Sequence, residues 1–458
     1  MEHTKAWTTY KAKDIKALES LAQRYRAFLD AGKTERECVT EAVRLAEAKG
    51  FVNIDSVKKA KPGTRVYANC MGKALLLFVV GKKPIIEGMN ILGAHIDSPR
   101  IDLKQNPLYE DGDMAYLDTH YYGGIKKYQW VTLPLAMHGV VAKSDGTVVN
   151  ITIGEDESDP IVGISDLLIH LAREQMGGKA SNLIDGEALN IIIGGKPVTN
   201  ADDKEKEPVK AGILKILEEK YGIGEKDFIS AEIEVVPAGK ARDFGLDRSM
   251  IMAYGHDDRS CAYPSLEAIL NVKGVPERTC LCLLSDKEEI GSVGATGMHA
   301  RYFENTVAEL MNLAGEYSEL NLRRALSSCR MLSSDVSAGF DPNFASVFEK
   351  KNAAFLGRGI CFNKYTGAGG KSGSNDANAE FIGWLRKVMD DAGVNFQTSE
   401  LGKVDAGGGG TIAYICALYG MNVIDCGVPV LSMHAPWEII NKADLYEALK
   451  AYTAFLAS

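Results

Sequence analysis

Short apolar runs recur along this chain and alternate with stretches of helical periodicity. The runs lie at 75–80, 91–96, 279–284, 331–334, 353–356 and 421–426. Short apolar runs of this kind are typical of strands that are buried on both faces of a sheet. Helical patterns lie at 12–30, 34–50, 259–272 and 376–392, with Thr34 as a candidate N-cap of the second. The alternation predicts an α/β core.

The length of the chain predicts a second domain, because 458 residues exceed what one hydrophobic core usually supports. Between about 104 and 245 the pattern changes to strand-like runs at 129–142, 147–153, 189–193 and 229–236. These runs surround an acidic loop at 155–159 and a charged run at 202–207, both expected to be solvated. We therefore predict a catalytic domain made of 1–104 and 246–458, and an inserted β-rich domain at 105–245.

Composition excludes several classes of protein. Charged residues make up 25% of the chain and the net charge is -9, which favours neither a nucleic-acid groove nor an anionic membrane surface. The nine cysteines show no metal-binding or redox spacing and are expected to be reduced thiols. The N-terminus lacks the apolar core of a signal peptide, and no apolar run approaches the length of a membrane span. We expect a cytoplasmic protein with neither nucleic-acid nor membrane partners.

A ligand-type histidine ends one of the apolar runs. His95 stands at the end of the run 91–96, one residue before its last, and Asp97 follows two positions after His95. A metal-bound imidazole needs its second ring nitrogen held by a partner, commonly a carboxylate, so His-x-Asp can supply ligand and partner together. The alternative is a histidine that is only hydrogen-bonded at a strand end.

The same order, an apolar run followed by ligand-type side chains, occurs in four further segments: 254–260, 284–292, 331–336 and 429–436. In an open α/β sheet, residues at the carboxyl ends of the strands converge even when they are far apart in sequence. Each segment also has a plain structural interpretation. Asp257 and Asp258 could cap a helix, Glu288 could begin an exposed helix, Asp335 could lie in a turn, and His434 could be a core histidine. Their joint occurrence favours a metal site.

In these segments the chain resembles the co-catalytic dizinc exopeptidases, and among them the M18 metalloaminopeptidases of the aspartyl aminopeptidase and aminopeptidase I type, bacterial branch. The resemblance extends from 93–99 to 432–434. It implies a catalytic domain with a mixed, mainly parallel sheet covered by helices. It also implies two divalent metal ions per subunit, Zn²⁺ or otherwise Co²⁺ or Mn²⁺, and peptide substrates.

The resemblance also implies roles for individual residues. Five side chains match metal ligands: His95, Asp257, Glu289, Asp335 and His434. Asp257 would bridge the two ions. The resemblance leaves open which of the two ions Glu289 binds and which Asp335 binds. Glu288 matches the general base that acts with a bridging metal-bound hydroxide, and Asp97 would orient His95. Two divalent cations, three carboxylates and one hydroxide sum to zero charge, which makes burial of the site tolerable.

Flanking segments bear on substrate and assembly. His170 matches a family histidine that reaches a neighbouring subunit's active site, although a histidine on a helix surface is the competing interpretation. Lys364, Tyr365 and Gly409 lie in loops that resemble substrate-facing loops. These loops depart from those of the aspartyl-specific members, so a neutral or broad N-terminal preference is favoured over a strictly acidic one. The family implies a homo-oligomer, a tetrahedral dodecamer.

Two other functions stay open at the level of sequence. A dizinc carboxypeptidase or deacylase of the same clan would use the same metal ligands. A non-catalytic assembly protein with a vestigial site is the alternative from another class.

Overall fold

The computed structural model describes residues 4–198 and 206–458, which divide into two compact units. The first unit comprises 1–98, 241–433 and 438–458, and the second comprises 99–240 and 434–437. The boundaries expected from the sequence, 104/105 and 245/246, differ from these by a few residues. A boundary at 104 would cut strand β5 (Arg100–Asp111), which runs unbroken through the sheet of the second unit. Residues 202–205 of the predicted charged loop lie outside the described residues.

The main sheet of the first unit is mixed, with a parallel centre. Its strands in the described chain, in spatial order, are β1 (Val52–Asn53), β2 (Arg65–Cys70), β3 (Ala74–Val79), β13 (Thr279–Ser285), β4 (Met89–His95), β14 (Arg330–Ser333), β18 (Asn422–Gly427), β16 (Ile360–Asn363) and β17 (Phe396–Thr398). The central strands β13, β4, β14 and β18 are parallel to one another. Antiparallel pairs join β2 to β3, β3 to β13, and β18 to β16. The predicted α/β class, with a mixed and mainly parallel sheet, is confirmed.

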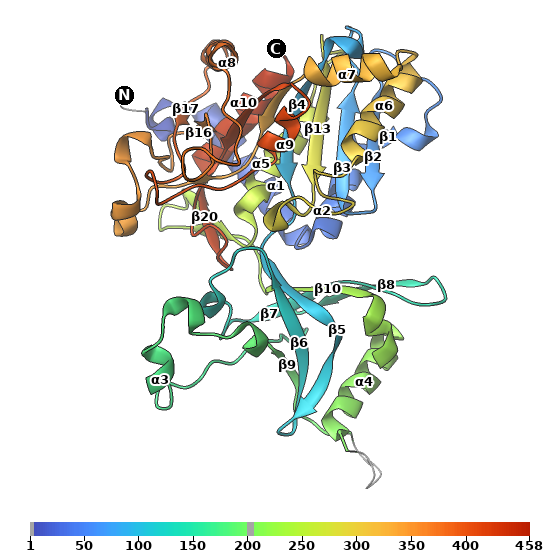
Figure 1. Cartoon of the computed structure of the whole chain (residues 1–458), viewed down its shortest axis with the longest axis vertical. Coiled ribbons are helices and arrows are strands. Elements are labelled where there is room, and N and C mark those ends of the chain that lie inside the picture. Colours follow the sequence, from blue (N-terminus) through green and yellow to red (C-terminus); the bar gives the residue numbers. More distant parts are fainter. Residues whose placement is uncertain (1–3, 199–205) are drawn as a thin grey trace. The chain divides into compact units, whose positions relative to one another are not determined.

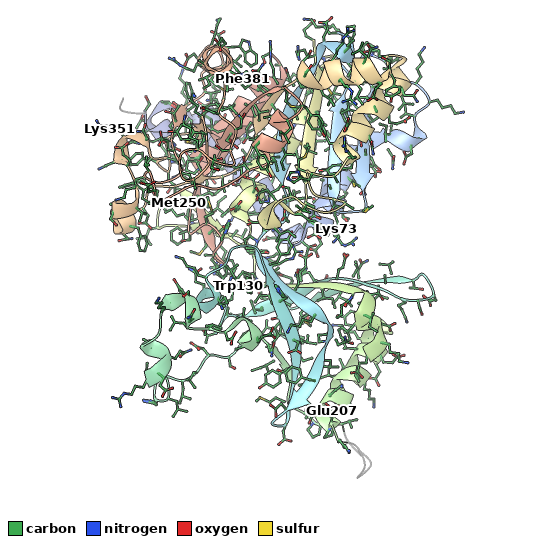
Figure 2. All side chains as sticks on the ribbon, in the orientation of Figure 1. Lys73, Trp130, Glu207, Met250, Lys351 and Phe381 are labelled. Carbon is green, nitrogen blue, oxygen red and sulfur yellow. The ribbon has the colours of Figure 1, made fainter. Side chains whose placement is uncertain are left out.

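Helices cover both faces of this sheet (Figure 1). Side chains of β13 alternate between two cores, with Cys280 and Cys282 in one and Leu281 and Leu283 in the other. The first core is closed by α1 (Ala12–Ala31), α2 (Glu35–Glu47), α5 (His256–Leu270), α8 (Ala379–Asp391) and α10 (Lys442–Leu456). The second core is closed by α6 (Tyr302–Ala314), α7 (Glu319–Ser327) and α9 (Ala413–Ala417). Figure 2 shows the side chains that fill these layers, among them Phe381 on α8.

Local sequence rules account for most of these elements. Thr34 caps α2 as predicted, because its side chain accepts a hydrogen bond from the backbone N–H of Glu37 at 3.2 Å. The predicted strand at 353–356 is wrong. Only an isolated bridge forms there, between Ala354 and Gly339, and the backbone N–H of Phe355 donates to the side chain of Gln397 instead of to a neighbouring strand. The sheet strand follows at β16.

A small second sheet also belongs to the first unit. Its strands are β11 (Arg242–Phe244), β12 (Met250–Ala253), β20 (Glu438–Asn441), β19 (Pro429–Leu431) and β15 (Ser337–Ala338). Strand β12 leads into α5 through Tyr254 and Gly255. This sheet therefore carries the segments that hold Asp257, Asp335 and Glu438.

The second unit is built on an antiparallel sheet. In spatial order its described strands are β8 (Val148–Ile153), β7 (Leu135–Ala142), β10 (Ala231–Pro237), β5, β6 (Met114–Tyr122) and β9 (Ile191–Gly194). It also contains α3 (Arg173–Met176), α4 (Pro208–Tyr221) and Trp130, whose side chain is fully buried and is labelled in Figure 2. The sequence does not predict the hairpin of β5 and β6, because its strands mix polar and apolar residues and the apolar stretch at 114–117 is short. Among the described helices, none combines the length and the apolar character that a bilayer crossing needs.

Candidate active site

Three of the predicted site segments meet at one edge of the main sheet. His95 is the last residue of β4, Asp335 follows β14 closely, and Glu288 and Glu289 lie in the short 3-10 helix η8 (Glu288–Ile290) just after β13. Strands β13, β4 and β14 are adjacent and parallel, so their carboxyl ends lie at the same edge. The order and direction of these strands therefore bring the three segments together, as the sequence predicts.

Asp257 reaches the same place from the small sheet, at the start of α5. Its backbone N–H donates to Glu438 Oε2 at 3.0 Å, and its carbonyl accepts a hydrogen bond from Ser98 Oγ at 2.7 Å. Gly255 precedes it with φ of 74°, and a Cβ at Gly255 would lie 2.3 Å from Arg259 Nη1. Glycine is therefore required where β12 turns into α5, because this turn aims Asp257 at the strand ends.

Arg259 anchors the same helix to the end of β4. Its Nε and Nη2 donate to the carbonyl of Ile96, each at 3.2 Å, and Nη2 also donates to the carbonyl of Lys33 at 3.0 Å. The side chain is fully buried. Arg259 thus fixes the start of α5 relative to the strand that carries His95.

His95, Asp257 and Asp335 form a candidate metal group. Each offers one ligand atom, and these atoms lie within 4.8 Å of one another. His95 Nε2 is 3.2 Å from Asp257 Oδ1. An imidazole with two carboxylates is a donor set that suits Zn²⁺ and related divalent ions.

Asp97 lies directly behind this group and is completely buried. His95 Nδ1, the ring nitrogen that faces away from Asp257, is 3.0 Å from the backbone carbonyl oxygen of Asp97 and 3.3 Å from its carboxylate Oδ1. The same carboxylate accepts hydrogen bonds from the backbone N–H groups of Glu288 and Glu289, at 3.1 and 3.2 Å. The sequence predicts the contact with His95 but not the two bonds to η8. Asp97 therefore positions the histidine through its carbonyl and its carboxylate, and the two glutamates through its carboxylate.

The electrostatics of the site reflect crowded carboxylates. Burial disfavours the charged ring of His95, yet the carboxylates of Asp257 and Asp97 outweigh burial and raise its pKa well above the usual range. Burial, followed by the charge of Asp258 and Glu288, raises the pKa of Asp335. Burial also raises the pKa of Asp258, whose Oδ2 accepts a hydrogen bond from the backbone N–H of His95 at 3.3 Å. Divalent cations would relieve this repulsion, so the donor set fits the predicted metals.

His434 lies in the short segment 434–437, which belongs to the second unit. Its Nδ1 is 2.8 Å from the carbonyl oxygen of Gly124, a residue of the same unit. The segment is joined covalently to Met433, which packs against a core of the first unit, and to Glu438, whose carboxylate accepts the N–H of Asp257. Both ends of the segment that carries His434 are therefore attached to the first unit.

The predicted substrate loops contact one another. Tyr365 lines a cavity of about 230 Å³ together with Lys371 and Glu400, and its hydroxyl donates to Glu400. Lys364 and Lys371 both pair with Asp376. The backbone N–H of Gly409 donates to the carbonyl of Thr366 at 2.9 Å, which ties the glycine loop to the lysine loop. His170 lies away from these loops in the chain, in an exposed segment of the second unit.

Sequence reasoning missed Glu438 and Ser98, which hold the two sides of the Asp257 backbone. Glu438 had a usable signal, because a carboxylate that stands between Trp437 and Ile439 in an apolar strand must have a buried partner. Ser98 had none beyond its closeness to Asp97.

Comparison with known proteins identifies the family. A family model described as "Aminopeptidase I zinc metalloprotease (M18)" matches residues 28–456. The chain belongs to the M18 peptidase family. A probable M18 family aminopeptidase 1 from Clostridium acetobutylicum is 60% identical, over 99% of this chain and 98% of that protein.

Solved M18 structures show the same fold. The crystal structure of the M18 aminopeptidase from Thermotoga maritima matches with a TM-score of 0.95 and 45% identity, over 100% of this chain and 99% of that one. The crystal structure of aminopeptidase I from Clostridium acetobutylicum matches with a TM-score of 0.94 and 57% identity, over 100% of both chains. This M18 chain is accordingly an aminopeptidase, a hydrolase of a zinc metalloprotease family.

Proposed function

We propose that this M18 chain removes N-terminal residues from peptides by two-metal hydrolysis. The observation that carries the proposal is the meeting of His95, Asp257 and Asp335 in front of an Asp97 that also positions Glu288 and Glu289. The proposed ligands of the two ions are His95, Asp257, Glu289, Asp335 and His434. Zn²⁺ is the proposed metal, with Co²⁺ or Mn²⁺ as substitutes. The proposal does not assign Glu289 and Asp335 to one ion or the other.

When held by these residues, two divalent cations would polarise the scissile carbonyl and acidify the attacking water. Glu288 is the proposed general base. It would take a proton from the attacking water and deliver it to the leaving amine. Because Asp97 accepts the backbone N–H groups of both glutamates, it fixes the backbone of η8, and consecutive side chains of a 3-10 helix leave that backbone in different directions. This explains how adjacent, chemically identical residues could divide into a base and a ligand.

The substrate loops support a neutral or broad N-terminal preference. Lys364 and Lys371, two of the cations of these loops, both pair with Asp376. A lysine that is paired with an aspartate attracts a substrate carboxylate less strongly than an unpaired lysine does. A screen of aminoacyl fluorogenic substrates should give higher kcat/KM for alanyl and leucyl than for aspartyl and glutamyl substrates. A reversed order would refute this part of the proposal.

Assembly into a homo-oligomer is the second part of the proposal, with the tetrahedral dodecamer as the form that the resemblance implies. Its support is an exposed apolar segment around His170, in which Leu167, Leu168, Ile169 and Leu171 are 46–68% exposed. Contiguous apolar side chains of this kind commonly mark protein interfaces. His170 would then act on a neighbouring subunit's substrate.

Charged substitutions in this segment test the assembly. Leu168→Asp should dissociate the oligomer, because a carboxylate cannot be buried in an apolar interface without a partner. His170→Ala should leave the oligomer intact but lower kcat/KM. Sedimentation velocity and peptide hydrolysis measure the two effects, and an unchanged mass for Leu168→Asp would exclude this segment from the interface.

A cytoplasmic location stays a prediction.

Glu288→Gln tests the chemistry. The variant should keep its metal, because Glu288 is not a proposed ligand, and lose about 100-fold to 10,000-fold in kcat, the usual contribution of a general base. Metal content by mass spectrometry and hydrolysis of a free-amine peptide are the measurements, and the exposed Glu380→Gln is the matched control.

The choice of substrate end separates the rival hydrolases. The wild-type protein should hydrolyse peptides with a free N-terminus and leave N-acetylated peptides intact. Cleavage of only the blocked peptides would favour a deacylase or carboxypeptidase. Hydrolysis of neither would favour a non-catalytic assembly protein.

A further inference from the structure

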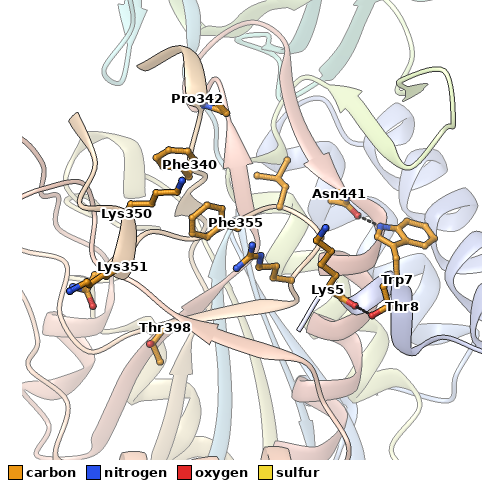
Figure 3. A pocket seen from close by; sticks show the side chains of 14 residues that line it. Lys5, Trp7, Thr8, Phe340, Pro342, Lys350, Lys351, Phe355, Thr398 and Asn441 are labelled. Carbon is orange, nitrogen blue, oxygen red and sulfur yellow. Dashed lines mark hydrogen bonds between the residues drawn. The ribbon is translucent and has the colours of Figure 1, made fainter. Parts of the chain in front are cut away.

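The first unit contains a cavity of about 1010 Å³ that no predicted site residue lines. It lies between the N-terminal segment with the 3-10 helix η1 (Ala6–Thr9), the chain at 340–358, and the ends of β17 and β20. Figure 3 shows Phe340 and Phe355 in its middle part, with Thr398 and Asn441 at its edges. The volume is of the size that ligand pockets have.

The lining of this cavity is cationic. Lys5, Lys350, Lys351 and Arg358 contribute to it, and no aspartate or glutamate is among its described lining residues. None of the four forms an ion pair with any residue that the structure describes. Grouped cations without ion-pair partners create a local positive potential, which attracts anions even though the net charge of the chain is -9.

Aromatic rings hold two of these cations in place. The Arg358 guanidinium lies 4.5 Å from the ring centroid of Phe355, and Lys350 Nζ lies 5.7 Å from that of Phe340. Trp7 is oriented as well, because its indole N–H donates to Asn441 Oδ1 at 3.0 Å. Cation–π contacts use the face of a ring and leave the N–H donors of the cation available to a ligand. The cavity therefore offers preoriented donors beside apolar surface.

Lys5, Lys350 and Lys351 are spread along the cavity and do not converge on one point. In Figure 3, Lys350 and Lys351 lie on one side of Phe355, while Lys5 and Trp7 lie on the other. A single phosphate is best bound by donors that converge on it. Separated cations with apolar surface between them match carboxylates spaced along an extended peptide, whose side chains on one face repeat every 6–7 Å or so. We propose that this cavity binds an acidic segment of an extended peptide.

The cavity is joined to the candidate active site by two short stretches of chain. Strand β20 runs from Glu438, which holds the Asp257 backbone, to Asn441 at the cavity, a rise of about 10 Å. The chain from Asp335 to Phe340 spans at most about 17 Å when fully extended. A peptide of a few residues is long enough to cover such distances. On the proposed function, the acidic segment belongs to a peptide substrate, downstream of the bond that is cut.

A binding experiment on the full chain tests the cavity without turnover. The probe is an N-acetylated, C-amidated peptide of alternating glutamate and alanine, compared with its glutamine counterpart by calorimetry at low and moderate salt. The glutamate peptide should bind at least tenfold more tightly, and salt should weaken it. Lys350→Glu/Lys351→Glu should lower the affinity at least tenfold. Lys58→Glu/Lys59→Glu, a neighbouring pair of exposed lysines outside the cavity, should leave it unchanged.

Three outcomes would overturn the proposal. They are equal affinity for the glutamate and glutamine peptides, unchanged affinity in Lys350→Glu/Lys351→Glu, and tight binding of pyrophosphate or ATP with none of the acidic peptide. Circular dichroism and hydrolysis of a small neutral aminoacyl substrate check that the variant is folded. If the wild type binds the probe but hydrolyses nothing, the proposed function fails and the binding site stands. If the wild type and Lys350→Glu/Lys351→Glu hydrolyse the small substrate equally and also bind the probe equally, the proposed peptide site fails and the proposed aminopeptidase function stands.

Discussion

Asp97 is the single residue on which most of the candidate active site depends. Its buried carboxylate lies behind the ring of His95 and accepts the backbone N–H groups of two glutamates that come from another strand end. An aspartate suits this position because its two oxygens can receive several donors at once. The residue therefore couples the orientation of a proposed metal ligand to that of the proposed base.

Asp97→Asn should weaken metal affinity and kcat/KM by about 10-fold to 100-fold, the usual cost of losing a carboxylate behind a metal ligand. The amide has one acceptor oxygen, so its NH₂ group would face one of the backbone donors. Metal competition with a chelator and peptide hydrolysis measure the two effects, with the exposed Asp55→Asn as control. His95→Ala should do more damage, because it removes a proposed ligand. Equal losses in the two variants would show that Asp97 is itself a ligand.

At the scale of elements, the turn between β12 and α5 decides where Asp257 points. Gly255 has a left-handed φ and faces Arg259 and Ser98, the two residues that tie α5 to the end of β4. A methyl group there would lie 2.3 Å from Arg259 Nη1 and 3.0 Å from Ser98 Oγ. Any shift that relieves these contacts moves the start of α5.

Gly255→Ala should therefore lower both stability and activity, whereas Gly274→Ala should lower stability alone. Gly274 lies beyond the other end of α5 with φ of 64°, and nothing within 4 Å would touch its Cβ. Each variant pays about 1–2 kcal/mol for the left-handed backbone, measured by chemical denaturation. Only Gly255→Ala should lose metal affinity and kcat/KM. Equal activity in the two variants would mean that the turn does not position Asp257.

At the scale of the whole molecule, a buried acid predicts how stability depends on pH. Asp444 on α10 is completely buried, and its carboxylate accepts the backbone N–H groups of Gly357 and Gly359, each at 2.7 Å. Burial outweighs these bonds and raises its pKa to about 8. In the unfolded chain an aspartate has a pKa of about 3.9. Between these values the folded protein keeps a proton that the unfolded chain has released.

The contribution of Asp444 to the free energy of unfolding is thus complete below about pH 4 and falls as the pH rises to about 8, by at most about 1.4 kcal/mol per pH unit. Thermal unfolding from pH 5 to 9 at a fixed metal concentration measures it. Asp444→Asn cannot titrate, so its midpoint should fall less steeply between pH 5 and 8 than that of the wild type. Parallel curves for the two proteins would show that Asp444 ionises normally in the fold.

The sequence by itself determined the α/β class and the segments that carry the candidate site. Both rest on local patterns, since an apolar run that ends in His95 or precedes Asp335 can be read without knowing its neighbours. Prediction of strands from the sequence failed where the backbone's hydrogen-bond partners are distant in the chain. The run at 353–356 is apolar enough for a strand, yet its hydrogen bond goes to the side chain of Gln397. The strands β5 and β6 form a long hairpin although polar residues interrupt both of them and the apolar stretch at 114–117 is short.

Only the tertiary structure decided which groups meet. The order β13-β4-β14 brings His95, Glu289 and Asp335 to one edge, and it places Asp97 against the backbone of η8. The tertiary structure also decided that Glu438 holds the backbone of Asp257, and that Lys5 and Lys350 line one cavity. The physical reason is that a ligand atom or a cation acts over a few ångströms. Residue types and their order therefore show which chemistry is available, and strand order and packing determine where it is assembled.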